Sequence, residues 1–342
     1  MSDCKRIAVL GGGSFGTVIA NIAAENGYDV ALWMRNEDAV QEIQQTGINQ
    51  RYLPDLVLHE NLSVSSDLQT AVDGANVIFF AIPSKSFRMV VEQVSGFISE
   101  GQMVVSTTKG IEPGTLNLMS DILRSELPNN RVGVMGGPNL AKEIAKHEIT
   151  ATVIASEDSD LRRIVQEALS CEYFRVYASA DVYGVELGGA LKNIYAIIAG
   201  IAAAKKLGEN TIAMLLTRSI AEMGRFAERQ GANPMTFLGL SGVGDLIATC
   251  CSPLSRNYRV GFAFGEGKNL EQAIESLGEV AEGVNTLKQV KRYADEHDIY
   301  MPLVQGLYKV MYEQQPISMV VKGLMLAERN TDVEYTLPKD EI

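Results

Sequence analysis

The chain has 342 residues, of which 46% are hydrophobic and 21% are charged, and its formal net charge is −12. The length predicts two domains, each large enough to bury a core, and the composition is ordinary for a globular protein. The excess of negative charge argues against a nucleic-acid partner and against binding to an anionic membrane.

Cysteine and histidine usage gives no sign of a metal site. The four cysteines have no metal-ligand spacing, and the three histidines are scattered. Cys250 and Cys251 are adjacent, where a disulfide would be strained. Lys5 and Arg6 lead into a short apolar run, so no signal peptide is expected, and the apolar run 77–82 is too short to span a bilayer. We therefore expect reduced cysteines, no bound metal, no membrane insertion and a cytoplasmic location.

The first elements of the chain are an apolar strand at residues 7–10, a glycine-rich turn, and an alanine-rich helical pattern at residues 17–26. In this turn Gly11 would make the tight bend, Gly13 would let a pyrophosphate approach the backbone, and Gly16 would let helix and strand pack closely. The start of the helix adds N–H groups that attract phosphates. This order of elements predicts a dinucleotide site.

Alternating strand and helix patterns continue to about residue 180. Strands are expected at residues 28–34, 77–82, 103–107, 131–135, 149–155 and 174–177, and helices at 36–45 and 161–170. Such alternation predicts an α/β domain over residues 1–180 with a doubly wound, mostly parallel sheet. Ligands of such sheets bind at the carboxyl ends of the strands, which here carry residues 81–84, 108–110 and 136–139.

From residue 181 onward the strand patterns give way to helical ones. The expected helices span residues 182–206, 211–230, 257–264, 269–277, 286–296 and 302–312. Residues 181–335 are therefore predicted to form an all-α domain. The apolar stretch 194–204 fits either the core of this domain or a contact between two copies, and we expect a homodimer.

Two lysines are candidates for the chemistry. Lys109 follows a strand end at the ligand-binding edge of the sheet. Lys192 lies in the most apolar helical pattern, and its side chain should lean over Gly188 and Gly189, which would leave room for a small substrate. Burial near other cations would weaken the proton affinity of this lysine and prepare it for proton transfer near neutral pH.

Residues 240–257 suggest a phosphate site. Ser255 or a neighbour could cap the helix that follows, and Arg256 at the helix start offers a planar fork that fits a phosphate with two hydrogen bonds. Upstream, Asp245 ends a glycine-rich loop. It would cap a helix, orient Lys192 or accept a hydrogen bond from a substrate hydroxyl, and the spacing alone does not decide among these roles.

The end of the second strand bears on the type of cofactor. NAD-specific folds often place Asp or Glu there, whereas this chain has Arg35, whose charge suits a 2′-phosphate. Glu37 and Asp38 follow closely. NADP(H) is therefore favoured, and NAD(H) stays possible.

Together these motifs resemble those of the bacterial-type NAD(P)-dependent glycerol-3-phosphate dehydrogenases over essentially the whole chain. The resemblance rests on seven segments in the same order: residues 11–17 (GGGSFGT), 108–112 (TKGIE), 137–143 (GPNLAKE), 190–193 (ALKN), 242–246 (GVGDL), 255–257 (SRN) and 280–283 (VAEG).

The resemblance implies an N-terminal Rossmann domain and a helical substrate domain like that of 6-phosphogluconate dehydrogenase. It also implies reduction of dihydroxyacetone phosphate to sn-glycerol 3-phosphate with a nicotinamide cofactor, as a supply for glycerophospholipid synthesis. By position, Lys192 resembles the general acid/base of the family, and Lys109 resembles a residue that touches both substrate and cofactor.

The family positions form two sets. The implied substrate-binding set is Lys109, Gly137, Asn139, Lys192, Asp245, Ser255, Arg256 and Asn257. The implied cofactor-binding set is Gly11, Gly13, Ser14, Phe15, Gly16, Arg35, Lys109, Ala141, Arg256, Val280 and Glu282. Many relatives carry Ser or Thr in place of Asn139, which puts the role of this residue in question.

Two alternatives remain open on the residues alone. A related β-hydroxyacid or sugar-acid dehydrogenase would share the architecture but would need a carboxylate site in place of residues 255–257. A non-catalytic dinucleotide sensor would have no need for Lys109, Lys192 and Asp245 together.

Overall fold

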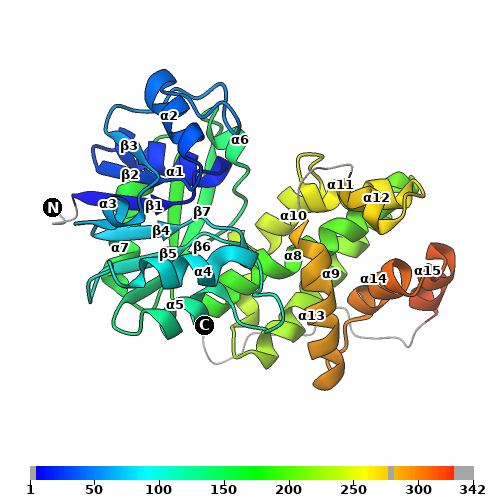
Figure 1. Cartoon of the computed structure of the whole chain (residues 1–342). Helices are drawn as coiled ribbons and strands as arrows, with labels where there is room; N and C mark the ends of the chain where they lie inside the picture. The colour runs from blue at the N-terminus through cyan, green and yellow to red at the C-terminus, as the bar shows by residue number, and fades with distance from the viewer. Residues whose placement is uncertain (1–4, 276–280, 327–342) are drawn as a thin grey trace. The chain divides into compact units, whose positions relative to one another are not determined.

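The structure is a computed structural model, and it describes residues 5–275 and 281–326. Two compact units follow each other along the chain, Met1–Glu186 and Leu187–Ile342. The strands all lie in the blue-to-green part of the chain in Figure 1, and the yellow-to-red part is helical. The division falls inside a helix, close to the residue 180 at which the sequence changes character.

The first unit is built around one eight-stranded sheet with the order β3-β2-β1-β4-β5-β6-β7-β8. Neighbouring strands are parallel except β6 and β7, which pair antiparallel. The doubly wound, mostly parallel sheet is thus confirmed. Its strands are β1 (Arg6–Leu10), β2 (Asp29–Trp33), β3 (Leu62–Ser65), β4 (Val77–Phe80), β5 (Met103–Ser106), β6 (Arg131–Gly136), β7 (Thr150–Ala155) and β8 (Phe174–Ser179).

Side chains of the strands alternate between two apolar cores, one on each face of the sheet. In β1, Ile7 and Val9 belong to one core, and Ala8 and Leu10 belong to the other. The first core is covered by α1 (Ser14–Glu25), α2 (Glu37–Thr46), α6 (Ala141–Ile144) and α7 (Ser159–Leu169). The second is covered by α3 (Leu68–Val72), α4 (Ser84–Ser95) and α5 (Met119–Glu126).

The position of β1 decides where a ligand can bind. β1 lies between β2 and β4, so the order of strands reverses there. In open sheets of this kind the crevice for a ligand lies at the carboxyl ends of the strands beside such a reversal. The glycine turn follows the carboxyl end of β1, so the fold puts it at this crevice.

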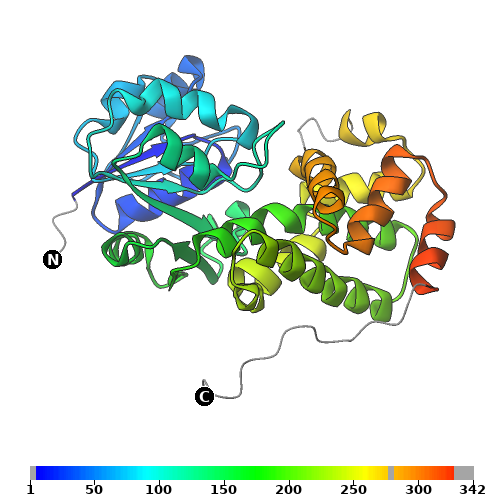
Figure 2. The same ribbon diagram turned by 90° about the horizontal axis from the view of Figure 1, so that it is seen from below.

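The described part of the second unit, residues 187–275 and 281–326, contains helices and no strand, which confirms the predicted all-helical half (Figure 2). Its elements are α8 (Val182–Ala204), which begins in the first unit, α9 (Glu209–Arg229), a 3-10 segment (Pro234–Leu238), a π-helical turn (Leu240–Gly244), α10 (Asp245–Cys250), α11 (Arg256–Gly265), α12 (Leu270–Glu275), α13 (Glu282–Glu296), α14 (Pro302–Tyr312) and α15 (Ile317–Met325).

A buried carboxylate joins three of these helices. Glu222 of α9 accepts hydrogen bonds from the backbone N–H groups of Leu303 (2.5 Å) and Val304 (3.3 Å) at the start of α14, and from the hydroxyl of Tyr195 on α8 (3.2 Å). Glu222 is 1% exposed, and burial raises its pKa to about 7. The carboxylate therefore serves as the N-terminal cap of α14.

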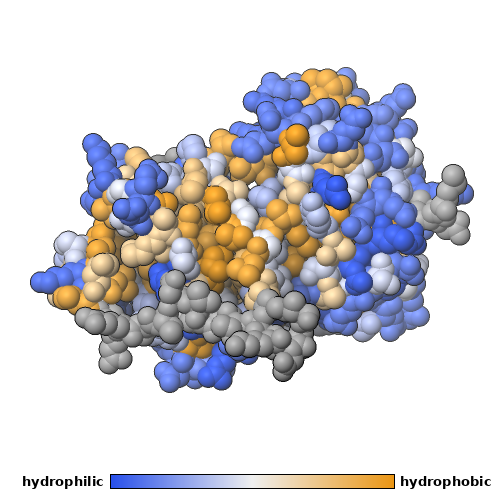
Figure 3. All heavy atoms as spheres, turned by 180° about the vertical axis from the view of Figure 1, so that it is seen from behind, coloured by the Kyte–Doolittle hydropathy of each residue, from blue (hydrophilic) through white to orange (hydrophobic). Residues whose placement is uncertain are grey.

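The apolar stretch 194–204 of α8 is mostly buried, as expected for a core helix. By contrast, no residue of α15 is buried, and Met319 and Met325 are 66% and 67% exposed. Figure 3 shows one face of the molecule, on which hydrophobic residues form patches between hydrophilic areas.

The sequence does not predict β3, α3, α4, α5, α6, α10 or α15. β3 has only four residues, and polar and apolar side chains alternate in it, so it lacks the continuous apolar run of the central strands. The glycine-rich stretch 240–246, which the sequence suggests is a loop, is helical. The predicted helix at residues 269–277 extends past Glu275, and its last two residues lie outside the described part of the chain.

Candidate functional site

The glycine turn has the geometry of a phosphate cradle. Gly11 has φ +120°, and a Cβ at Gly16 would collide with the carbonyl oxygen of Gly11, so helix and strand meet here without side chains. A Cβ at Gly13 would meet open space. Among the described residues, no side chain caps the start of α1, where Ser14 and Phe15 are the first two residues. These features fit a pyrophosphate bound to the N–H groups of α1.

The side chain of Asn49 is hydrogen-bonded to this turn, and the sequence alone did not predict that contact. Its side chain is buried (2% exposed), and Nδ2 donates to the carbonyl oxygen of Gly12 (3.0 Å) and to Oγ1 of Thr17 (2.9 Å). The amide therefore joins the turn to the first turn of α1. No motif signals this residue, because it lies in an irregular segment far from the turn in sequence.

Arg35 lies just beyond the end of β2 and is exposed. It follows Met34, whose side chain fills the space beside Gly12, since a Cβ at Gly12 would collide with it. The acidic residues that complicated the choice of cofactor, Glu37 and Asp38, belong to the first turn of α2. Carboxylates stabilise that end of a helix, so their presence has a structural reason.

Lys109 and the loop after β6 form a second group in the first unit. Nζ of Lys109 donates to the carbonyl oxygen of Gly137 (2.8 Å), which has φ +123°. Nδ2 of Asn139 donates to Oγ1 of Thr152 (2.9 Å), and this hydroxyl donates to Gly136 (2.8 Å). Ala141 is the first residue of α6. The structure thus brings four predicted residues, Lys109, Gly137, Asn139 and Ala141, to the carboxyl ends of β5 and β6.

An ion-pair cluster anchors the loop that carries Lys109. Glu112 accepts from Arg88 of α4 (2.6 and 3.1 Å), from the hydroxyl of Thr115 (2.8 Å) and from the amide of Asn117 (3.0 Å). Hydrogen bonding from Arg88, the largest effect, lowers the pKa of Glu112 to about 2. The loop is therefore fixed three residues after Lys109.

In the second unit, Lys192 of α8 forms a buried ion pair with Asp245 at the start of α10. Their side chains are 4% and 2% exposed. The hydroxyl of Thr249 also donates to the same carboxylate oxygen (3.4 Å). Asp245 does not cap its own helix, since Gly244 occupies that position. Of the roles that the sequence left open, the geometry does not support the cap, and the ion pair fits the role in which Asp245 orients Lys192.

The expectation about Gly188 is wrong. We expected this glycine to leave space for a substrate beside Lys192. Instead, a Cβ at Gly188 would collide with the carbonyl oxygen of Ser241. The missing side chain lets the backbone of the π-helical turn approach α8, and this turn leads directly into Asp245. Gly188 therefore serves packing, not substrate access.

The segment 255–257 forms the start of α11 as expected. Oγ of Ser255 accepts from the backbone N–H of Tyr258 (3.3 Å) and caps the helix. Arg256 is the first helical residue, and it is exposed, whereas Asn257 is buried. An arginine beside the N–H groups of a helix start fits a phosphate.

Asn257 also has an internal function. Its Nδ2 donates to Oδ1 of Asn193 (2.9 Å), and its Oδ1 accepts from the backbone N–H of Gly283 (3.0 Å). This side chain therefore joins α8, α11 and α13. Glu282 opens α13 beside Gly283. Val280, the remaining predicted cofactor residue, lies outside the described residues.

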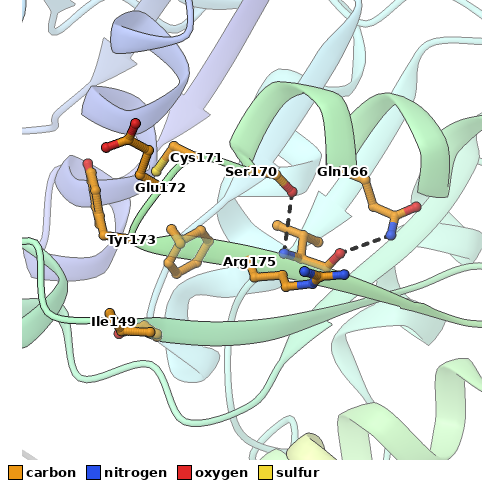
Figure 4. Close-up of a pocket in the computed structure, with 10 residues that line it drawn as sticks. Ile149, Gln166, Ser170, Cys171, Glu172, Tyr173 and Arg175 are labelled. Atoms are coloured by element: carbon orange, nitrogen blue, oxygen red, sulfur yellow. Dashed lines mark hydrogen bonds between the residues drawn. The ribbon is translucent and has the colours of Figure 1, made fainter.

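A hollow with a volume of ≈ 490 Å³ lies along β8 in the first unit, and none of the predicted site residues lines it (Figure 4). Here Gln166 of α7 donates to the carbonyl oxygen of Val176 (2.9 Å), and the hydroxyl of Ser170 accepts from the N–H of Val176 (3.4 Å). The helix thus covers the backbone of β8 at the outer side of the strand.

The described residues, 5–275 and 281–326, contain no group of three or more His, Cys, Asp or Glu side chains that could hold a metal ion. α8 is long and apolar enough to cross a membrane, but 83% of its most apolar window is buried inside the protein. Such burial is also found in core helices.

Known proteins match the chain over nearly its whole length. Residues 6–162 match the model of the NAD-dependent glycerol-3-phosphate dehydrogenase N-terminus, and residues 181–322 match the model of its C-terminus. A glycerol-3-phosphate dehydrogenase (NAD(P)+) of Ectopseudomonas mendocina (strain ymp) is 56% identical over 335 residues, which cover 98% of this chain and 98% of that protein. The crystal structure of glycerol-3-phosphate dehydrogenase from Coxiella burnetii has a TM-score of 0.89 and 37% identity, and the match covers 95% of this chain and 99% of that chain.

Proposed function

Because this chain belongs to the family of NAD-dependent glycerol-3-phosphate dehydrogenases, we propose that each of its two units supplies a defined set of residues to the reaction. The chain is an oxidoreductase that uses a nicotinamide dinucleotide to interconvert dihydroxyacetone phosphate and sn-glycerol 3-phosphate, which supplies glycerophospholipid synthesis. Identity of 56% over 98% of the chain sets aside the sugar-acid dehydrogenase and the non-catalytic sensor.

For the cofactor, we propose the glycine turn and its surroundings. The N–H groups after Gly13 bind the pyrophosphate, with Ser14 and Phe15 beside it, and Lys109 and Ala141 contact the cofactor further along the sheet edge. Arg256, Val280 and Glu282 complete the proposed cofactor set. When bound, the cofactor supplies the hydride.

For proton transfer, we propose Lys192 as the general acid/base. During reduction its Nζ gives a proton to the carbonyl oxygen of the substrate, and in the reverse direction it takes that proton back. Asp245 lies beside the lysine and orients it. The buried ion pair of these two residues is the observation that supports this proposal most strongly.

Replacement of Lys192 tests this role. In Lys192→Ala, kcat should fall by orders of magnitude while the fold stays intact. Lys205→Ala, at an exposed lysine just after α8, is the matched control and should keep wild-type turnover. Near-normal turnover of Lys192→Ala with dihydroxyacetone phosphate would sink the assignment.

For substrate binding, we propose that Arg256 and the N–H groups at the start of α11 clamp the phosphate, with Ser255 fixing the helix start. Asn257, Gly137 and Asn139 contribute further contacts or shape. Arg256→Ala should raise the KM for dihydroxyacetone phosphate much more than it lowers kcat. The exposed Arg259, three residues along the same helix, provides the control Arg259→Ala, and an unchanged KM in Arg256→Ala would contradict the clamp.

We further propose that Arg35 favours NADP(H) over NAD(H). Its exposed guanidinium at the end of β2 suits a 2′-phosphate. Arg35→Ala should raise the KM for NADPH and leave the KM for NADH nearly unchanged, whereas Arg163→Ala, on α7, should change neither. Equal effects of Arg35→Ala on both cofactors would refute the preference.

We also propose a homodimer located in the cytoplasm. The exposed apolar side chains of α15 support self-association, since such residues are enriched at subunit contacts. Light scattering after size-exclusion chromatography gives the mass in solution, and Met319→Glu should shift a dimer toward monomer. A monomeric wild-type protein at micromolar concentration would exclude the dimer.

A further inference from the structure

The antiparallel strand β7 brings one buried hydroxyl to the loop that carries Asn139. In the β6–β7 pair, Gly136 lies opposite Val153, so Thr152 lies beside the carboxyl end of β6. We propose that Thr152 is a positioning residue that orients the amide of Asn139 so that its carbonyl oxygen accepts a hydrogen bond from a bound ligand. This inference rests on the proposed function, because it names the chemistry of one of its binding residues.

The hydroxyl of Thr152 has a single proton, and that proton is donated to the carbonyl oxygen of Gly136. Thr152 is 0% exposed, and its Oγ1 donates to the carbonyl oxygen of Gly136 (2.8 Å). Toward any other neighbour the hydroxyl can therefore only accept. The neighbour is Nδ2 of Asn139, at 2.9 Å. Thr152 thus determines which end of the amide faces it.

This orientation leaves the other end of the amide without a partner. Oδ1 of Asn139 is buried and has no hydrogen-bond partner among the described residues. If the amide were turned over, Oδ1 and Gly136 would compete for one hydroxyl proton, and the NH₂ group would lose its acceptor as well. The orientation in the structure therefore leaves the fewest polar atoms unsatisfied.

The unpartnered oxygen belongs to the loop after β6, which also contacts Lys109 and lies at the edge of the sheet where ligands bind. Gly137, two residues earlier, accepts from Nζ of Lys109 (2.8 Å), and the loop follows the carboxyl end of β6, where ligands of such sheets bind. A buried acceptor that the protein does not satisfy is satisfied by a donor on the ligand. The donor is an O–H or N–H group, supplied by a hydroxyl of the substrate or by the carboxamide of the cofactor.

This arrangement distinguishes Asn139 from a hydroxyl side chain at the same position. A serine or threonine can donate or accept and adapts to either kind of ligand atom. The amide held by Thr152 presents an acceptor alone. Position 139 therefore selects for a donor in this chain.

The test compares Thr152→Val, which removes the hydroxyl at nearly constant volume, with Thr152→Ser, which keeps it. Three quantities are measured: the KM for dihydroxyacetone phosphate, the Kd for NADPH alone by fluorescence, and the melting temperature. Thr152→Val should weaken one of the two affinities by about tenfold, the typical effect of an unpaired buried acceptor, and Thr152→Ser should restore it. A change in KM alone assigns the donor to the substrate hydroxyl, and a change in Kd assigns it to the carboxamide.

Two results would overturn the inference. One is a folded Thr152→Val protein with both affinities unchanged, and the other is a Thr152→Ser protein as impaired as Thr152→Val. If Thr152→Val does not fold, Asn139→Ala takes its place, because it leaves the bond from Thr152 to Gly136 intact. Unchanged affinities in Asn139→Ala would then refute the inference. Each of these results leaves the activity of the wild-type protein unchanged. They are therefore distinguishable from a failure of the proposed function, in which the wild-type protein would not reduce dihydroxyacetone phosphate.

Discussion

Replacing Asp245 by asparagine should destabilise the protein in a way that depends on pH. The change keeps the shape of the side chain but removes the negative charge beside Lys192, whose side chain is 4% exposed. Removing one partner of a buried ion pair typically costs about 3–5 kcal/mol, because the remaining charge is left buried and unpaired.

The lysine can avoid this penalty by releasing its proton, which sets an upper limit to the loss. An unfolded lysine titrates near pH 10.4, and each pH unit below that value costs about 1.4 kcal/mol for a side chain held neutral. The loss of stability in Asp245→Asn is therefore at most about 5 kcal/mol at pH 7 and about 2 kcal/mol at pH 9. Because the folded variant binds fewer protons than its unfolded state, its stability rises with pH across this range.

Urea unfolding of wild type and Asp245→Asn at pH 7, 8 and 9 measures these differences. Asp295→Asn is the matched control, because Asp295 pairs with Lys291 at the surface, with side chains 43% and 29% exposed, and such pairs contribute less than about 1 kcal/mol. A neutral amine has no proton to give, so reduction of dihydroxyacetone phosphate by Asp245→Asn should be at least tenfold slower at pH 7. A loss of stability that is equal at pH 7 and pH 9, together with normal turnover, would refute the reasoning.

Three further predictions concern stability and cofactor binding. Burial raises the pKa of Glu222 to about 7, so the folded state holds a proton that the unfolded state releases near pH 4.5. The free energy of unfolding should therefore fall by about 3 kcal/mol as pH rises from 5 to 8. Urea unfolding of Glu222→Gln should show this pH dependence largely removed. Gly188→Ala should lower the melting temperature and turnover together, because its Cβ collides with Ser241, and a fully active, equally stable variant would contradict this packing role. Asn49→Ala should weaken NADPH binding about tenfold in a fluorescence titration, since Gly12 loses a buried donor; wild-type affinity would show that the turn does not need this amide.

The sequence predicts the sheet well for a physical reason. Strands of a parallel sheet are buried on both faces, so β4 and β5 read as continuous apolar runs. The sequence predicts the glycine turn equally well, because the requirements of the turn are local: a positive φ at Gly11 and close packing at Gly16. The antiparallel reversal of β7, which brings Thr152 to Asn139, has no such local signal.

The site can be predicted only in part, because its contacts join segments that are far apart in the sequence. The pairing of Lys192 with Asp245 depends on how α8 and α10 pack, so the sequence spacing left three roles open for Asp245. Gly188 is a second example. The sequence shows that this helical position has no side chain, but it does not show whether the space left beside it is open to a ligand or filled by another segment, here the backbone of Ser241. Asn49 is invisible to motif analysis, because its hydrogen bonds reach Gly12 and Thr17 across the fold.

The covered edge of β8 has a consequence for how this protein can associate. An edge strand normally offers free backbone groups that a strand from another molecule can join, which leads to continuous sheets and to aggregation. At Val176 both backbone groups are already bonded to Ser170 and Gln166. A second molecule would have to displace these side chains before it could extend the sheet there, so hydrogen-bonding side chains protect the edge at Val176, next to the exposed charge of Arg175. Loss of both side chains, in a Gln166→Ala, Ser170→Ala double variant, would turn a closed edge into a site for intermolecular strand pairing.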